Sequence, residues 1–199
     1  MKNKLIYIIT TLIIISISAR IIYINVNKES IKAENIAKGD IAEIGDNFFD
    51  SSDELMNGYS VKILSSEIVK ADDYLKKYGH SVDEQFYDDL SYYYIVRVSV
   101  RNKNNSYVGE KGINFQRWYI EGSDYILRIE DYAYSLANSI EGNSLSISLR
   151  EDSEMEFELP FYVFSESHSY NKLKNDFSNL VITDYPVKIK MSLNWFSLP

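Results

Sequence analysis

The sequence predicts a mainly β fold, an antiparallel two-sheet sandwich, preceded by one N-terminal transmembrane or signal helix. Two observations predict it. An apolar run opens the chain, and after Gly58 apolar residues recur at every second position in five separate segments. A period of two is typical of strands with one buried and one solvated face, which antiparallel sheets provide. The 199 residues have room for one short N-terminal segment and one domain of ordinary size.

The N-terminal segment, residues 1–26, is long enough to cross a membrane. As a helix, Leu5–Val26 spans about 33 Å, slightly more than the roughly 30 Å hydrocarbon core of a bilayer. Arg20 interrupts the run. An arginine costs about 2.5–3.5 kcal/mol at the bilayer centre, and the many Leu, Ile and Val residues, at about −0.3 to −0.6 kcal/mol each, outweigh it. Its side chain can also reach back toward the interface.

We therefore favour an uncleaved anchor, with two alternatives. A cleaved signal peptide is the first alternative, because Ser16–Ala19 contains small residues, although no good cleavage motif. A buried core helix is the second alternative, which the lack of a polar face disfavours. Lys2 and Lys4 favour an N-terminus inside the cell. The expected location is the cell membrane, single-pass, with the domain outside the cytoplasm, or secretion if the segment is cleaved.

Charge and cysteine usage exclude several classes of function. The net charge is −8, and Lys2, Lys4 and Arg20 are the only charged residues before Asn27, so the remainder carries −11. Such a surface is unsuited to nucleic acid. The absence of cysteine excludes disulfides, thiolate nucleophiles and cysteine-ligated zinc. We expect no cofactor and no metal.

A polar stalk, residues 27–39, is expected between the anchor and the β-sandwich domain, residues 40–199. The stalk contains few apolar residues and is predicted to be briefly helical from Ser30, ending at Gly39. The domain begins with a lead-in loop, in which Phe48 and Phe49 are expected to pack against the sheets.

Alternating segments mark the expected strands, and Pro160 marks one of them as an edge strand because proline cannot donate to a ladder. A short helix is predicted at Ala71–Tyr78, stopped by Gly79, and an irregular excursion at Arg128–Asn143. The clear strands are Tyr59–Ile63, Tyr94–Arg101, Leu145–Leu149, Phe157–Val163 and Val187–Leu193, and a weaker hairpin joins Phe115–Ile120 to Tyr125–Ile129.

Several segments, in order, carry a family resemblance: IGDNFF, NGYSVKI, YIVRVSVRNKNN, RWYIEGSDY, LREDSEMEFELPFYV and YPVKIKMSL. Over roughly residues 40–196 the chain resembles the Gram-positive extracellular immunoglobulin-like family called domain of unknown function 5028. The resemblance implies an immunoglobulin-like sandwich outside the membrane. It carries over no activity, since the matching residues (Asn102, Gly122 and Leu159-Pro160-Phe161) are structural.

The acidic strand is the first candidate for chemistry. Glu154, Glu156 and Glu158 alternate along one strand face, about 6.5–7 Å apart. Three such acids suit a solvated edge that resists aggregation, a cation site, or a hydrolase, in that order of preference. The only histidines, His80 and His168, lie in polar stretches without a partner motif and are expected to be exposed loop residues.

The aromatic residues are the second candidate. Tyr92, Trp118 and Tyr119 belong to two aromatic-rich stretches. Exposed, they would form a ligand or partner patch, and buried, they would belong to the core.

Three functions follow as hypotheses. The favoured one is a membrane-tethered, non-enzymatic binding module for a protein or envelope ligand. The alternatives are an accessory subunit of a membrane complex that is joined through the N-terminal helix, and a carboxylate- or cation-dependent envelope hydrolase.

Overall fold

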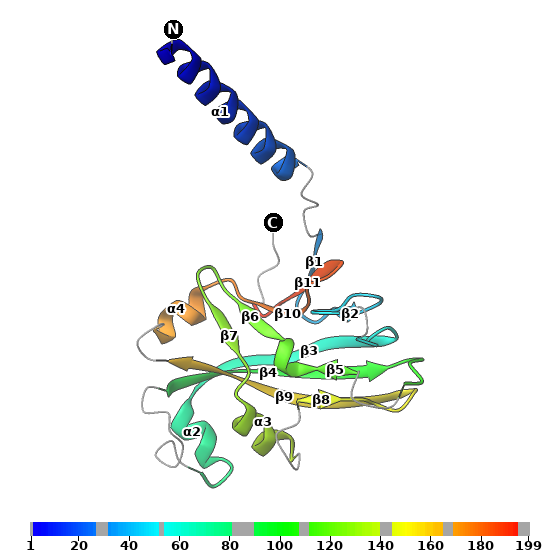
Figure 1. Cartoon of the computed structure of the whole chain (residues 1–199). Coiled ribbons are helices and arrows are strands. Elements are labelled where there is room, and N and C mark those ends of the chain that lie inside the picture. The colour runs from blue at the N-terminus through cyan, green and yellow to red at the C-terminus, as the bar shows by residue number, and fades with distance from the viewer. Residues whose placement is uncertain are drawn as a thin grey trace. The chain divides into compact units, whose positions relative to one another are not determined.

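The computed structural model describes residues 2–26, 32–51, 54–80, 90–107, 112–139, 145–164 and 169–194. Contacts divide the chain into two units, and each is described by itself. The first contains the helix α1 (Lys2–Val26), and the second begins at Lys32 and contains the sheets (Figure 1).

Two larger sheets, packed as a sandwich, make up most of the second unit and confirm the predicted mainly β class (Figure 1). The first sheet has the order β1-β11-β10-β6-β7, and the second has the order β2-β3-β4-β9. Every pair in them is antiparallel except β1 and β11, which are parallel. The bounds are β1 (Lys32–Ile36), β2 (Ile41–Glu43), β3 (Tyr59–Lys70), β4 (Leu90–Asn102), β6 (Tyr119–Glu121), β7 (Ile126–Arg128), β9 (Ser153–Phe164), β10 (Asn179–Thr183) and β11 (Val187–Ser192).

The predicted alternation of buried and exposed residues is clearest on β4. Val96, Val98 and Val100 are fully buried between the sheets, whereas Arg97 and Arg101 on the opposite face are exposed. Burying an aliphatic side chain of this size contributes roughly 1.5–3 kcal/mol, so a strand with this pattern is held strongly in one register. The prediction for Pro160 is confirmed too, because β9 lies at the edge of its sheet.

Two predicted strands are shorter than expected. Of Leu145–Leu149, only β8 (Ser146–Ile147) is a strand, and it pairs with β5 (Ile113–Asn114). A 3₁₀ turn, Phe115–Arg117, interrupts the segment predicted as one strand. The turn forms because the Asn114 side chain accepts a hydrogen bond from the Gln116 N–H at 3.0 Å. The predicted hairpin beyond it is confirmed as β6 and β7.

The segment Arg128–Asn143 was predicted to be irregular, and this was wrong for α3 (Asp131–Asn138). Glu130 caps the helix by accepting from the Tyr132 N–H at 3.2 Å and the Ala133 N–H at 2.6 Å. Glutamate is not among the usual N-cap residues, so the start signal was not recognised. A further helix, α4 (Tyr170–Asn175), was also not predicted.

The expectation of a helical stalk was wrong for residues 32–36, which form β1 and pair in parallel with β11. This edge strand is held through its backbone, and its side chains are largely exposed. It therefore lacks the apolar alternation by which a strand is recognised in a sequence. The sheet unit consequently starts eight residues before the expected boundary at residue 40.

Two smaller predictions are confirmed. The lead-in loop packs against the domain, because the Phe48 N–H donates to the Tyr185 carbonyl at 2.6 Å and the Phe49 side chain is buried. The helix α2 (Ala71–Lys76) ends before Gly79, which has a φ of +81°. With α3, α2 covers a second apolar cluster on the outer face of β4, which includes Tyr93.

Within the described part of the chain, no helix combines the length and the apolar character that a membrane span requires.

Gly58 allows a sharp test of the fold. Its φ is +90°, and an added Cβ would lie 2.5 Å from Asn104 Oδ1. Gly79 has a similar φ of +81°, but its Cβ would meet nothing within 4 Å. We expect Gly58→Ala to lower the free energy of unfolding by about 2–4 kcal/mol and Gly79→Ala by about 1–2 kcal/mol. Urea unfolding followed by circular dichroism measures both. Equal losses would show that the contact with Asn104 does not constrain this turn.

Candidate functional site

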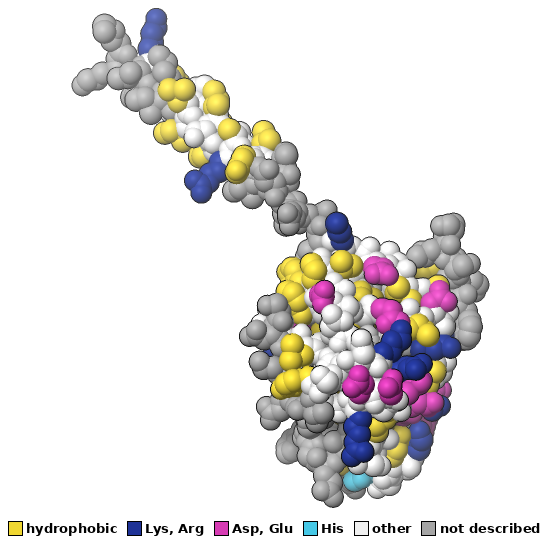
Figure 2. Space-filling view, turned by 90° about the vertical axis from the view of Figure 1, so that its right-hand side faces the viewer, with side chains coloured by type: hydrophobic (Ala, Val, Ile, Leu, Met, Phe, Trp, Pro, Cys, Tyr) yellow, Lys and Arg dark blue, Asp and Glu magenta, His cyan; other side chains and the backbone are white. Residues whose placement is uncertain are grey.

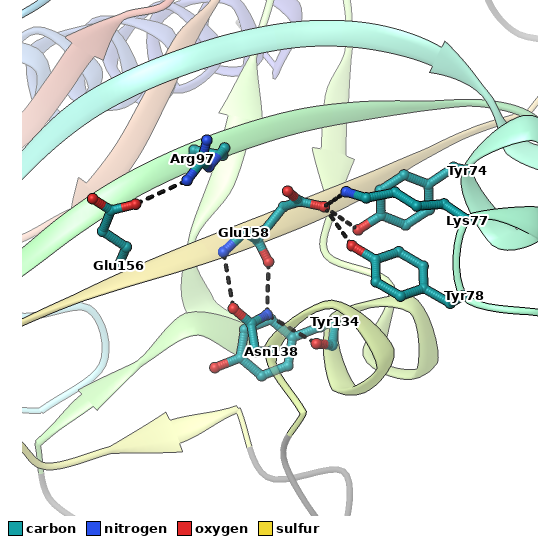
Figure 3. A network of polar contacts seen from close by, with 8 residues as sticks. All are labelled: Tyr74, Lys77, Tyr78, Arg97, Tyr134, Asn138, Glu156 and Glu158. Carbon is teal, nitrogen blue, oxygen red and sulfur yellow. Dashed lines mark hydrogen bonds and ion pairs between the residues drawn. The ribbon is translucent and has the colours of Figure 1, made fainter.

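The acidic strand does not gather its carboxylates into one site, and Figure 3 shows Glu156 and Glu158 pointing to different partners. Glu154 accepts a hydrogen bond from Ser99, Glu156 pairs with Arg97 at 2.8 Å, and Glu158 turns toward α2. Each acid therefore has a partner of its own on a different neighbour. Among the described residues, no group of three acidic or histidine side chains is arranged to hold a metal ion.

The Glu158 side chain joins β9 to α2 and to the turn that follows α2 (Figure 3). Its Oε1 accepts hydrogen bonds from the Tyr74 hydroxyl at 2.8 Å and the Tyr78 hydroxyl at 3.0 Å, and Lys77 Nζ lies 3.6 Å away. Burial, and then the negative charge of Glu158, raise the pKa of Tyr74, so its hydroxyl remains a donor. This network fastens α2 to β9.

Asn138 covers the outer edge of β9 (Figure 3). Its Nδ2 donates to the Glu158 carbonyl at 2.8 Å, and its Oδ1 accepts from the Glu158 N–H at 2.9 Å. Two residues further along, the Glu130 N–H donates to the Pro160 carbonyl at 2.8 Å. One side chain and one turn thus occupy backbone groups that an edge strand would otherwise expose.

The sequence left two interpretations of Trp118 and Tyr119, an exposed patch or buried residues, and the structure contradicts the exposed patch for both. Trp118 is fully buried, with its ring centre 4.8 Å from that of Phe115. Tyr119 is only 7% exposed, because Arg128 and Lys188 lie over its ring at 4.9 and 5.4 Å. Trp118 therefore belongs to the core and Tyr119 is covered by neighbouring side chains, so the two rings do not form an exposed surface.

Tyr92, the third predicted patch residue, lies elsewhere. It is half-buried on β4, and its ring centre is 5.8 Å from that of Tyr170 on α4.

The two histidines were predicted to be exposed loop residues. His80 is half-buried rather than exposed, and it shares a 2.9 Å hydrogen bond with the Tyr132 hydroxyl. His168 lies outside the described residues.

The sequence did not predict that the second half of β3 has an edge to which no other described strand is paired. The first part of β3 is covered by β2, which pairs with Ser60–Lys62. A bulge between Ile63 and Ser65 follows. From residue 65 to residue 70, β3 pairs with β4 on one side, and no other described strand pairs with it on the other.

A cavity of about 500 Å³ adjoins this edge, and we call the two together the edge cleft. A hydrogen-bonded group on its wall joins the two sheets: Lys38 Nζ donates to Ser66 Oγ at 2.9 Å and to the Leu193 carbonyl at 2.8 Å. The lining residues come from five segments and are Lys38, Ser66, Glu67, Ile68, Tyr94, Tyr170, Lys174, Leu193 and Asn194.

Apolar rings and charged groups both line the edge cleft. Tyr94 is 5% exposed, and burial raises its pKa to about 12. Tyr170 is 38% exposed, and Lys174 Nζ lies 5.8 Å from its ring centre. Burial also lowers the pKa of Lys38. An arrangement of aromatic rings, amino groups and strand backbone can bind an extended ligand.

The comparisons with known proteins identify a family. The family model described as domain of unknown function (DUF5028) matches residues 33–189, a range that includes most of β1. No curated protein and no solved structure gives a significant match.

The role of Asn138 can be tested with a matched control. Besides its bonds to Glu158, Asn138 Nδ2 donates to the Tyr134 carbonyl, four residues earlier, at 2.8 Å. Asn175 at the end of α4 makes the same local bond to the Asn171 carbonyl at 2.8 Å, but contacts no strand edge through it. Losing the paired bonds to Glu158 should make Asn138→Ala less stable by about 1–3 kcal/mol. Asn175→Ala should cost less than about 0.5 kcal/mol. Urea unfolding of the two variants decides, and similar losses would refute the edge-covering role.

Proposed function

The chain belongs to the family of domain of unknown function (DUF5028), and we propose that it is a membrane-tethered, non-enzymatic binding module on the outer side of the membrane. The observation that carries this proposal is the edge cleft, which combines a cavity of about 500 Å³ with a strand edge that no other strand covers in the described part of the chain. Pockets of this size are typical of ligand sites in proteins.

The apolar surface of α1 supports the tether. Along the described part of the helix, successive apolar side chains point in different directions, at about 100° per residue, and each is more than half exposed. Figure 2 shows these hydrophobic side chains along the visible face of α1. Water disfavours such a surface by about 25 cal/mol per Å² of apolar area, so a bilayer or other apolar helices would cover it. The exposed apolar residues are Leu12, Ile13, Ile14, Ile15, Ile17, Ile21 and Ile22.

The order of the strands supports an immunoglobulin-like class for the sandwich. With β1 and β2 set aside, the sheets read β3-β4-β9 and β11-β10-β6-β7. In chain order this corresponds to strands A-B-E and G-F-C-C′ of an immunoglobulin-like domain. Domains of this class use exposed faces, edges and loops for recognition, which agrees with a binding role.

Binding is favoured over hydrolysis because the acids of β9 have separate partners. The accessory-subunit alternative rests on α1, since other apolar helices would cover its surface as a bilayer would. Exchanging residues 1–26 for an unrelated anchor separates the two. Function retained after the exchange supports the binding module, whereas function lost supports the accessory subunit.

Protease shaving of intact cells that express the full chain with a C-terminal tag tests the location. We expect the tag to be digested while the undigested protein has full length and sits in the membrane fraction. Replacing Lys2 and Lys4 by glutamate should raise the protected fraction, because basic residues hold the N-terminus inside.

A cytoplasmic protein serves as the control for intact cells. A tag that resists protease until lysis would overturn the outside location. A shortened, released protein would show a cleaved signal and remove the tether.

A further inference from the structure

We propose that the edge cleft binds an extended peptide, which adds as a strand to residues 65–70 of β3 and directs an acidic side chain toward Lys174. This inference rests on the proposed binding function and names the chemistry of the partner.

The first reason for this proposal is the strand edge of β3. A strand edge presents N–H and C=O groups that can pair with another chain, and folded proteins usually cover such edges. Here the opposite edge of the same sheet, β9, is covered by Asn138 and by the turn at Glu130. The β3 edge beyond Lys62 has no such cover among the described residues. A stretch of six residues, about 20 Å long, is sufficient for strand addition.

The second reason is that the cavity has room for side chains of an added strand. Alternate side chains of an added strand would point to the same side, so one or two of them would enter the space beside Ser66 and Ile68. Tyr94 and Tyr170 present aromatic surface there. An aromatic or large aliphatic side chain on the peptide would therefore be favoured at one position.

The third reason is the charge of the residues that line the cavity. The lining contains Lys38 and Lys174 but only one acid, Glu67, although the sequence after Val26 has a net charge of −11. Lys174 extends over the exposed ring of Tyr170. A local excess of positive charge in an acidic domain favours an acidic residue on the ligand and disfavours a basic one.

The test uses the full chain in detergent micelles and a phage library of random linear 12-residue peptides. We expect selection of peptides in which an acidic residue lies near an aromatic or aliphatic one. Synthetic copies, measured by fluorescence anisotropy, should bind about tenfold more weakly to Lys174→Glu than to the unchanged chain. The control is Lys62→Glu on β3, which changes the charge equally but lies outside the edge cleft, and it should bind as the unchanged chain does.

N-methylated peptides identify strand addition itself. In an added strand, alternate N–H groups face β3 and the others face away. Methylating the first set should lower affinity at least tenfold, and methylating the second set should leave it nearly unchanged. The proposal is overturned if no peptide is selected, if both sets behave alike, or if Lys62→Glu weakens binding as much as Lys174→Glu. Any of these results, together with an externally exposed tag in the shaving experiment, would leave the tethered binding module standing with a different ligand.

Discussion

The backbone groups at the two edges of the sheet built on β4 are the constraint on which the rest of this structure depends. β4 is a long central strand, paired along its length with β3 and β9. Each of these two neighbours therefore has a second side, whose backbone N–H and C=O groups β4 cannot pair. On β9, Asn138 and the turn at Glu130 form hydrogen bonds with backbone groups of this second side. On β3, β2 covers only the first part.

The positions of α2 and α3 agree with this asymmetry. α3 lies along β9, where Ala133 contributes to the cluster on the outer face and Tyr134 contributes to the main core. α2 is fastened to the same strand through Glu158. One side of the sheet is thus covered by helices that are hydrogen-bonded to it, and the acids of its edge strand have structural partners. The opposite side opens into the edge cleft, between β3 and the end of β11.

The sequence predicted what depends on local apolar patterning and missed what depends on distant contacts. The strands β4, β9 and β11, the hairpin and the edge position of Pro160 could be predicted, because period two and proline chemistry are local. β1 could not, since its pairing with β11 comes from the backbone and its side chains are exposed. α3 was missed because its cap is a glutamate.

The candidate site was missed for a related reason. Lys38, Ser66 and Tyr170 are far apart in the sequence, and no spacing motif connects them. The aromatic residues chosen instead, Trp118 and Tyr119, are buried, and composition alone does not separate a buried ring from an exposed one.

Backbone amide hydrogen exchange of the full chain, resolved by residue, tests most directly whether the β3 edge is open while the β9 edge is covered. We expect the exchange rate to alternate between fast and slow along residues 65–70, because every second N–H faces the uncovered side. We also expect slow exchange at Glu158, because its N–H donates to Asn138. Uniformly slow exchange along residues 65–70 would contradict the account, since it would show that this edge is already paired.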